Sequence, residues 1–212
     1  MKDIPMFTTE YGIAALSLRE IPYQQKAYIT LLSVLDPEKL VAECASFCRM
    51  CGAEHVYARA DQHLEGYPLY TAVWQMQARK CDIPETDAML FPAQEETLDH
   101  WRGIYNEKIL HVPNAAWMTE ADGKVMLNEG SGYFVHRDGC LLGIGKVIGS
   151  EIQWLAAVQP SAGADVLSAL ASLIDEDIVA LTVASVNKKA VSLYQKLGFV
   201  SVQETAKWHQ IF

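Results

Sequence analysis

The sequence predicts an α/β protein in which helices pack on the faces of a mixed β-sheet. Three observations favour this class: strand-like alternation near the N-terminus, a meander of three strands joined by hairpins, and a helix–strand–helix–strand order after the meander. The 212 residues are enough for one large domain or two small ones with cores of their own. Half of the residues are hydrophobic and a fifth are charged, which is typical of an ordinary globular chain.

The N-terminal part reads as a small unit of two strands, a helix and two strands. Its strands are expected at residues 14–18, 27–35, 54–58 and 69–77. The helix is expected to begin at Asp36-Pro37, because Asp is a favoured N-cap and Pro a favoured first residue, and to end at Gly52. The stretch from Gln77 to Asp87 is charged and has little apolar pattern. We therefore expect two domains, at residues 1–82 and 83–212.

The second part begins with a short strand at residues 88–91 and two helices. Leu98 and Ile109 bound the apolar stripe of the first helix. Thr119 and Asp122 have the spacing of a capping box for the second helix, which should close near Gly130.

An antiparallel meander is expected after these helices, because the sequence contains residues typical of two hairpin turns. Asp138-Gly139 and Gly149-Ser150 are the residues that two-residue hairpins demand. The meander strands are expected at residues 132–136, 140–148 and 151–158. The remaining elements are helices at residues 163–174 and 188–197, and strands at 178–184, 199–203 and 207–211.

The run from Asn187 to Phe199 reads Asn-Lys-Lys-Ala-Val-Ser-Leu-Tyr-Gln-Lys-Leu-Gly-Phe. It resembles the C-terminal signature of the GNAT acetyltransferases, which is roughly Asn, Ala, Leu-Tyr, Lys, Gly-Phe. The order of elements from Ala88 to Phe212 also agrees with that family. The resemblance implies a GNAT N-acetyltransferase domain at residues 83–212 that uses acetyl-CoA as cosubstrate and needs no metal. Residues 1–82 resemble a degenerate GNAT-like half-domain that has lost the cofactor.

The resemblance also implies a site. In the family the last meander strand, here residues 151–158, splays from its neighbour and admits the pantetheine arm between the two strands. Tyr194 resembles the general acid that protonates the departing sulfur, and Asn187 resembles the residue that holds the cofactor arm. The backbone amides expected to bind the thioester and the arm are those of Leu155, Ala156, Ala157 and Val158. Structural roles remain open, because Tyr194 also fits a core stripe and Asn187 fits an N-cap.

The phosphate loop departs from the family pattern. Residues 158–165 keep a Val-x-Pro lead-in and one glycine, but the loop is shorter than the family's and has no Lys or Arg. Asp165 places a negative charge near the expected phosphate. Amides at a helix N-terminus can still hold an anion, so Gly163 and Ala164 are expected to contact it. The alternative is a noncatalytic GNAT-like protein that binds acyl-CoA or another ligand.

The resemblance points to one residue as the general acid but leaves several candidates for the general base. Glu151 starts the splayed strand and is the first candidate, while Glu129, His136 and His209 are further ones. The acceptor is expected to be an amine of a small molecule or a peptide.

Charge and hydropathy exclude two classes of partner. The formal net charge is -9 and the basic residues are scattered, so no nucleic-acid surface is expected. No segment is long and apolar enough for a membrane span, and the N-terminus does not read as a signal peptide. With five cysteines, a reducing cytoplasmic location is expected. A homodimer is possible.

Two motifs resemble binding sites of other protein classes. Cys44, Cys48 and Cys51 have the spacing of a radical-enzyme iron–sulfur site, but all three fall on the expected apolar stripe of a helix, whereas cluster ligands converge from a loop. Gly143-Ile-Gly145 lies within a strand and lacks the third glycine of a dinucleotide motif. We therefore expect core packing for the cysteines and no metal.

Overall fold

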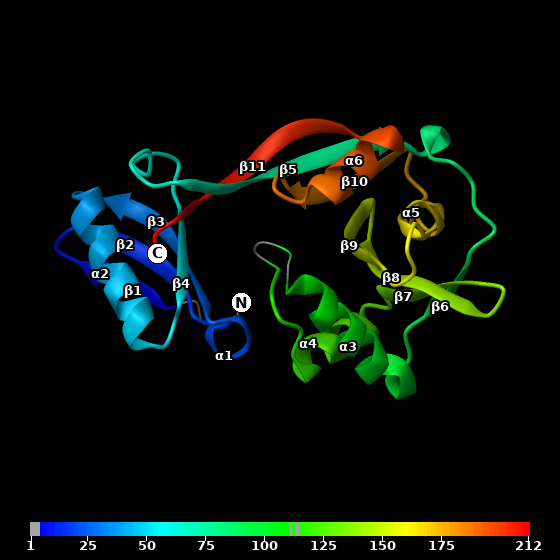
Figure 1. The fold of residues 1–212 in the computed structure, drawn as a ribbon, viewed down its shortest axis with the longest axis horizontal. Coiled ribbons are helices and arrows are strands. Elements are labelled where there is room, and N and C mark those ends of the chain that lie inside the picture. The colour runs from blue at the N-terminus through cyan, green and yellow to red at the C-terminus, as the bar shows by residue number, and fades with distance from the viewer. Residues whose placement is uncertain (1–4, 111, 113–114) are drawn as a thin grey trace. The chain divides into compact units, whose positions relative to one another are not determined.

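The computed structural model describes residues 5–110, 112 and 115–212 and folds as two compact units (Figure 1). The first comprises the residues up to Ala72 together with Thr205–Phe212, and the second comprises Val73–Glu204. Two strands, β5 (Leu69–Arg79) and β11 (Val200–Gln210), give residues to both units. This division differs from the expected one near residue 82, because β5 already enters the second unit at Val73 and the chain end returns to the first.

The first unit is a small sheet with one long helix. Its neighbouring strands pair antiparallel, except for β3 and β4, which are parallel. Its elements, besides the ends of β5 and β11, are β1 (Met6–Thr9), β2 (Gly12–Ser17), α1 (Ile21–Gln24), β3 (Lys26–Val34), α2 (Pro37–Met50) and β4 (His55–Arg59). Helix α2 begins as predicted, since the Asp36 carboxylate accepts a hydrogen bond from the Lys39 backbone N–H at 3.2 Å. Strand β1 was not expected.

The cysteines of α2 behave as core residues with one exception. Cys44 and Cys48 are fully buried between the helix and the sheet. Burial raises the pKa of the Cys44 thiol to about 11 and that of Cys48 to about 12. Cys51 was expected on the same stripe, but it is exposed at the C-cap, where the helix has already ended. The three sulfurs therefore do not share one environment.

The second unit contains most of the predicted elements. Its sheet order is β5-β10-β9-β8-β7-β6. The strands after β5 are β6 (Met89–Pro92), β7 (Gly132–Arg137), β8 (Cys140–Ile148), β9 (Glu151–Ala157) and β10 (Ile178–Ala184). The helices are α3 (Leu98–Ile109), α4 (Glu120–Asn128), α5 (Gly163–Ser172) and α6 (Lys188–Lys196), with short 3-10 helices at Lys80–Asp82 and Glu95–Thr97. Among the described residues, no helix combines the length and apolar character that crossing a membrane requires.

The capping and turn residues of the second unit form the local structures that the sequence predicts. Thr119 and Asp122 form the reciprocal hydrogen bonds of a capping box at the start of α4. Asp138 and Gly139 both have positive φ, at 50° and 76°, as a tight hairpin between β7 and β8 requires. One expectation was wrong: the two closing strands at 199–203 and 207–211 are the single strand β11. The residues between them, Glu204-Thr205-Ala206, contain no turn former, so nothing interrupts the strand.

Gly143 and Gly145 let α5 approach β8 closely. A Cβ added to Gly143 would lie 2.3 Å from the Ala156 carbonyl oxygen and 2.7 Å from a Val166 methyl carbon. A Cβ on Gly145 would lie 2.2 Å from a Leu170 methyl carbon. These two glycines therefore serve helix–sheet packing rather than nucleotide binding, and they mark the face of β8 that α5 covers. Figure 1 shows α5 on one side of β8 and the pair α3–α4 on the other.

The close approach at Gly143 predicts a large cost for a single methyl group. Gly143→Ala should destabilise the protein by about 1–3 kcal/mol, because the new Cβ meets backbone that cannot move freely. Gly103→Ala is the matched control, since Gly103 lies inside α3 with no atom near its missing Cβ, and it should stabilise by about 0.5–1 kcal/mol. Urea unfolding of both variants measures the difference. Equal stabilities would contradict this packing.

Candidate active site

Strands β9 and β10 are neighbours but pair only at one end. β9 pairs with β8 from Glu151 to Ala157, and β10 pairs with β5 along its whole length. Within these fully described strands, the register between β9 and β10 consists of Glu151 opposite Ala180 and Ile152 opposite Leu181. Beyond Ile152 the two strands separate while each keeps its other partner. We call this unpaired stretch the β9–β10 divergence (Figure 1).

The pairing of β9 with β8 decides which backbone amides face the divergence. The Val158 N–H donates to the Leu142 carbonyl at 2.8 Å, so this residue turns its polar groups toward β8. Because the hydrogen-bonded pairs of an antiparallel ladder alternate, Ala156 turns the same way. Leu155 and Ala157 then direct their N–H and C=O groups away from β8, toward β10.

Helices α5 and α6 close one face of the divergence. The side chains of Leu155 and Ala157 pack against the same core cluster as Val183 of β10 and Tyr194 of α6. Trp154 lies on the opposite face of β9, in the cluster of α3 and α4. The two faces of the sheet are therefore different at this point: one is covered by α5 and α6, and the other packs at Trp154 against aromatic rings of α3.

Tyr194 is buried beneath the divergence. Its side chain is 8% exposed and its ring centroid lies 6.0 Å from that of Phe199. Burial raises the pKa of the Tyr194 phenol to about 12, so the group keeps its proton at neutral pH. A protonated phenol can act as an acid, and its packing also makes it a core residue.

Asn187 occupies the N-cap of α6, as its sequence context suggests. Its side-chain Oδ1 accepts a hydrogen bond from the Ala190 N–H at 3.2 Å. This bond uses the amide oxygen and leaves the side-chain NH₂ group outside the cap. Capping and holding a ligand are thus compatible functions for this residue.

The loop from β9 to α5 ends in a helix start that lacks a side-chain cap. The N-cap is Ala162, which has no polar side chain, and Ser161 before it has a positive φ of 66°. The first amides of α5 are therefore not satisfied by a capping side chain. A Cβ on Gly163 would lie 2.8 Å from a Leu193 methyl carbon, so the single glycine of the loop allows α5 to start close to α6.

Asp165 pairs with an arginine that lies far from it in the sequence. Arg137, at the end of β7, donates to the Asp165 carboxylate at 2.7 and 3.3 Å, and Thr86 donates to it at 3.1 Å. The hydrogen bonds from Arg137 are the main reason that the pKa of Asp165 lies below its usual value. Arg137 also pairs with Asp87 at 2.6 Å. The negative charge on α5 is thus bound on the β7 side of the helix.

The candidate bases lie in different places. Glu151 is half-buried and starts β9 at the closed end of the divergence. Glu129 pairs with Lys146 at 3.1 Å, and hydrogen bonding to Lys146 lowers its pKa, which makes it a weak base. His136 lies on β7 with its ring 5.2 Å from that of Phe91. His209 belongs to the first unit, where its Nδ1 is 2.9 Å from the Tyr67 carbonyl oxygen.

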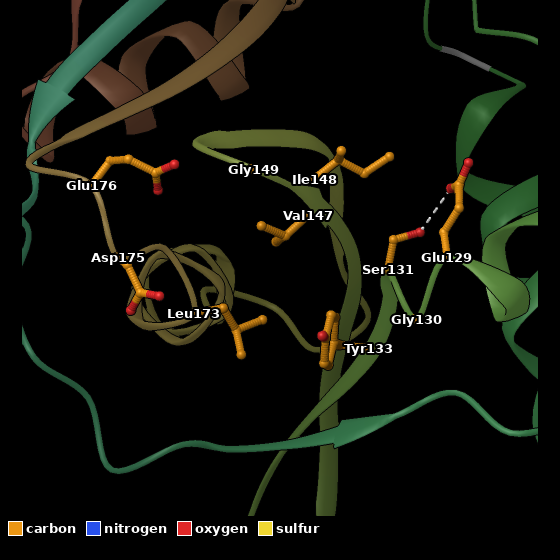
Figure 2. Close-up of a pocket in the computed structure, with 10 residues that line it drawn as sticks. All are labelled: Glu129, Gly130, Ser131, Tyr133, Val147, Ile148, Gly149, Leu173, Asp175 and Glu176. Carbon is orange, nitrogen blue, oxygen red and sulfur yellow. Dashed lines mark hydrogen bonds between the residues drawn. The ribbon is translucent and has the colours of Figure 1, made fainter.

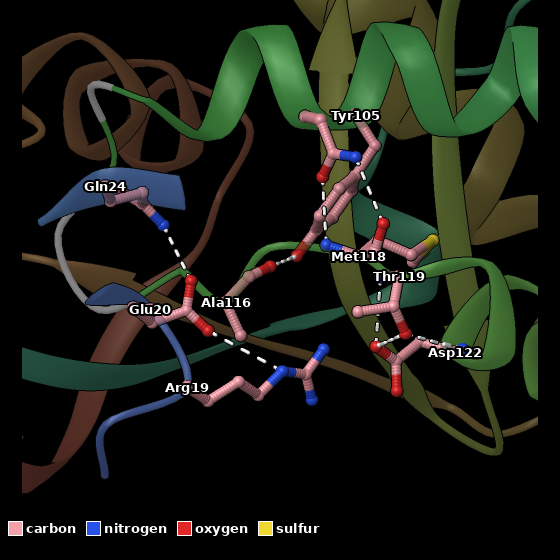
Figure 3. A network of polar contacts seen from close by, with 9 residues as sticks. Arg19, Glu20, Gln24, Tyr105, Ala116, Met118, Thr119 and Asp122 are labelled. Atoms are coloured by element: carbon pink, nitrogen blue, oxygen red, sulfur yellow. Dashed lines mark hydrogen bonds and ion pairs between the residues drawn. The ribbon is translucent and has the colours of Figure 1, made fainter. Parts of the chain in front are cut away.

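An aromatic group on α3 adjoins β9 and was not predicted as part of a site. The ring of Tyr105 lies 4.4 Å from that of Trp154, and Trp101 lies 5.9 Å from it. Tyr105 donates to the Ala116 carbonyl at 3.0 Å, which ties α3 to the following segment (Figure 3). Trp101 and Tyr105 could be assigned to one helix face from their spacing, but their contact with Trp154 depends on the fold.

Asn106, a buried residue of α3, holds the segment that precedes α4 in place. It exchanges two hydrogen bonds with the backbone of Met118, at 2.9 and 3.1 Å. Figure 3 shows the nearby capping box of Thr119 and Asp122 and, in the first unit, the bonds of Glu20 to Arg19 and Gln24. No sequence pattern identified Asn106, because a polar residue within a helix is usually exposed.

A separate cavity of about 560 Å³ lies at the turn that precedes β9 (Figure 2). Val147 and Leu173 contribute apolar surface, and Glu129 and Glu176 stand on opposite sides of it. It is lined by the β8–β9 turn and the end of α5, so it does not include the residues of the divergence.

Comparison with known proteins identifies the fold. No protein-family profile and no curated protein sequence matches this chain. Solved structures do match: a GCN5-related N-acetyltransferase from Sphaerobacter thermophilus is 12% identical with a TM-score of 0.57, over 94% of this chain and 76% of its own. The chain has the GNAT fold.

Two further structures bear on how far this GNAT likeness reaches. A tandem GNAT protein from the clavulanic acid biosynthesis pathway is 12% identical with a TM-score of 0.54, over 94% of this chain and 78% of its own. A functionally unknown conserved protein from Staphylococcus epidermidis is 11% identical with a TM-score of 0.62, over 98% of this chain and 93% of its own. At such identities the likeness establishes a GNAT fold, and a function must be argued from the site.

The pairing of Arg137 with Asp165 makes stability depend on pH. Because the pKa of Asp165 is lowered on folding, its contribution is present above the usual pKa of about 3.9 and is lost as the pH falls through the folded value. Arg137→Gln should lower the free energy of unfolding at about pH 7 by roughly 1 kcal/mol and much less at about pH 3.

Arg79→Gln provides the matched control for this measurement. Arg79 forms an exposed ion pair with Asp82, three residues along the chain, and should change stability by less than about 0.5 kcal/mol. Urea unfolding at both pH values tests the comparison. An Arg137→Gln loss that does not depend on pH would show that the ion pair is not its cause.

Proposed function

We propose that residues 83–212 act as an acyl-CoA-dependent N-acetyltransferase that transfers an acetyl group to an amine of a small molecule or peptide. The observation that carries the proposal is the β9–β10 divergence. It leaves peptide groups of a central, half-buried strand without a strand partner on one side, and peptide groups shielded from water require a hydrogen-bond partner. An extended chain with amide groups of its own, such as pantetheine, can satisfy them.

The directions of the peptide groups narrow the set of residues that would hold this arm. Leu155 and Ala157 present their N–H and C=O groups on the β10 side and are assigned to the thioester and the pantetheine. Val158 already donates to Leu142, and Ala156 has the same orientation. These two residues would contribute side-chain and steric contacts instead. Asn187 would bind the arm through its side-chain NH₂ group.

The diphosphate is assigned to the start of α5. The amides of Gly163 and Ala164 belong to a first helical turn without a side-chain cap, where anions bind favourably. Asp165 would repel a phosphate, but its carboxylate is paired with Arg137. This pairing supports binding despite the missing basic residues in the loop. The affinity should still be lower than for a loop with more glycine amides.

In the proposed reaction, residues around the divergence supply the base, the hydrogen-bond donors and the acid for acetyl transfer. Acetyl-CoA supplies an activated acetyl group as a thioester. Glu151 accepts a proton from the acceptor ammonium, and the amine nitrogen then forms a bond to the acetyl carbon. The N–H group of Leu155 stabilises the charge that develops on the acetyl oxygen, and that of Ala157, two residues further along β9, is left to bind the pantetheine arm. As the tetrahedral intermediate collapses, the carbon–sulfur bond breaks and Tyr194 donates its phenolic proton to the departing sulfur. The attacking nitrogen loses its remaining extra proton as the amide forms, and this proton restores the Tyr194 phenol through solvent, so that the products are the N-acetylated amine and the coenzyme A thiol.

A second function is favoured by one observation. Tyr194 packs within the core cluster of α5 and α6, as a purely structural tyrosine would. A GNAT-like protein that binds acyl-CoA or another ligand without turnover would have the same packing. Kinetics of a Tyr194 variant separate the two functions.

Other parts of the proposal rest on sequence and local structure. Residues 1–82 are assigned as a degenerate GNAT-like half-domain, because α2 starts at Asp36-Pro37-Glu38 and offers two carboxylates instead of a phosphate-binding glycine loop. A cytoplasmic location agrees with the five cysteines, all of which are free thiols.

Calorimetry with coenzyme A tests the cofactor site. The wild type should bind with a dissociation constant below about 1 mM. Asn187→Asp keeps a capping side chain but lacks the NH₂ group, so it should retain the melting temperature and bind coenzyme A about fivefold more weakly. Asn187→Ala is the companion variant, which should also lose thermal stability. Absence of wild-type binding at millimolar coenzyme A would refute the acyltransferase proposal.

Tyr194→Phe tests catalysis without disturbing the shape of the core. If the phenol protonates the leaving sulfur, kcat should fall by roughly a hundredfold while the affinity for coenzyme A is unchanged. Release of free thiol from acetyl-CoA measures the rate. An unchanged kcat would assign Tyr194 a structural role.

A further inference from the structure

The faces of the sheet determine from which side an acceptor reaches the divergence. Leu155 and Ala157 point their side chains into the core under α5 and α6, so that face is filled by protein. The opposite face carries Trp154 on β9 and Thr182 on β10, and Thr182 is exposed. An acceptor must therefore approach along the Trp154 face.

The reacting end of the site lies near Trp154. The diphosphate is assigned to Gly163, which follows the far end of β9, so an arm running between the strands ends toward Ile152. Trp154 is two residues beyond Ile152, the last residue of β9 paired with β10. Thr182 directly follows Leu181, the last residue of β10 that pairs with β9. These two side chains thus flank the acetyl end.

The Trp154 face combines an aromatic wall with a single carboxylate. Tyr105 and Trp101 pack on Trp154 and hold its ring in place. Glu151 lies on this face, because it alternates with buried Ile152 and pairs with Ala180, which shares a face with Thr182.

Among the described residues that adjoin Trp154 and Thr182 in the strand register, none adds an unpaired negative charge. Thr182 is paired with Gln75 of β5, and Ala180 with Gln77, so the β10 side is neutral. Beside Trp154 on β8 is Lys146, whose ammonium is bound by Glu129 at 3.1 Å. A second cationic group on an acceptor would find in this set only the Glu129 carboxylate, which Lys146 already binds.

We propose that the acceptor is a primary monoamine carried on a flat apolar body, an inference that rests on the function proposed above. The body packs against the indole of Trp154, and the ammonium pairs with Glu151, which removes its proton. Burial of apolar surface on an aromatic ring favours such a ligand, whereas a diamine pays for desolvation of an ammonium without a partner. Trp154 is the residue that determines this specificity.

Calorimetry on the protein saturated with coenzyme A tests the proposal with two amines of similar length. Phenylethylamine has one ammonium and an aromatic ring, and cadaverine has a second ammonium in place of the ring. Phenylethylamine should bind at least about tenfold more tightly than cadaverine. Trp154→Ala should reduce the phenylethylamine affinity by about tenfold, and Trp154→Phe, which keeps an aromatic face and the packing on Tyr105, should restore most of it.

Coenzyme A binding distinguishes a wrong acceptor class from a wrong acyltransferase function. If all variants bind coenzyme A normally but cadaverine binds as tightly as phenylethylamine, the acceptor class is wrong and the acyltransferase function stands. An unchanged phenylethylamine affinity in Trp154→Ala would equally overturn the role of Trp154. If the wild type does not bind coenzyme A, the proposed function fails and this inference fails with it.

Discussion

The incomplete pairing of β9 with β10 is the constraint on which the site depends. Each strand is held along its length by its other neighbour, β8 or β5, so the separation is part of the sheet and not a frayed edge. Because β9 is fixed on one side, the polar groups of Leu155 and Ala157 are held in place on the other. A preorganised set of peptide donors is what acyl-group chemistry requires.

The surrounding packing serves this geometry. Gly143 and Gly145 allow α5 to lie directly on β8, and Gly163 allows α5 to start beside α6. The two helices therefore cover one face of the divergence tightly and leave the other to Trp154. The ion pair of Arg137 with Asp165 offsets part of the negative charge at the start of α5, since Arg137 also pairs with Asp87. In the second unit, α5 and α6 thus cover one face of the divergence, and Trp154 lies on the other. The start of α5 has no side-chain cap.

The sequence predicted the elements that depend on local signals. The capping box at Thr119, the hairpin at Asp138-Gly139 and the N-cap at Asp36 are each specified by residues close together in the chain. The last strand was predicted as two, but the residues between the predicted parts contain no turn former, and pairing with β4 and β5 makes the strand continuous. The four residues of β1 were too few to form a detectable pattern.

The site was predictable in its parts but not in its arrangement. The signature around Asn187 and Tyr194 predicted the helix α6 with Asn187 at its N-cap, and the start of β9 was placed correctly. The orientation of each amide depends on the register with β8, which a single sequence does not encode in one place. For the same reason, the partnership of Arg137 and Asp165 could not be anticipated from residues so far apart.

A crystal structure of the protein with coenzyme A tests the central claim most directly. The account predicts an extended arm between β9 and β10 that accepts and donates hydrogen bonds at Leu155 and Ala157, with the diphosphate at the first turn of α5. Coenzyme A bound elsewhere, or β9 and β10 bonded to each other throughout in the complex, would contradict it.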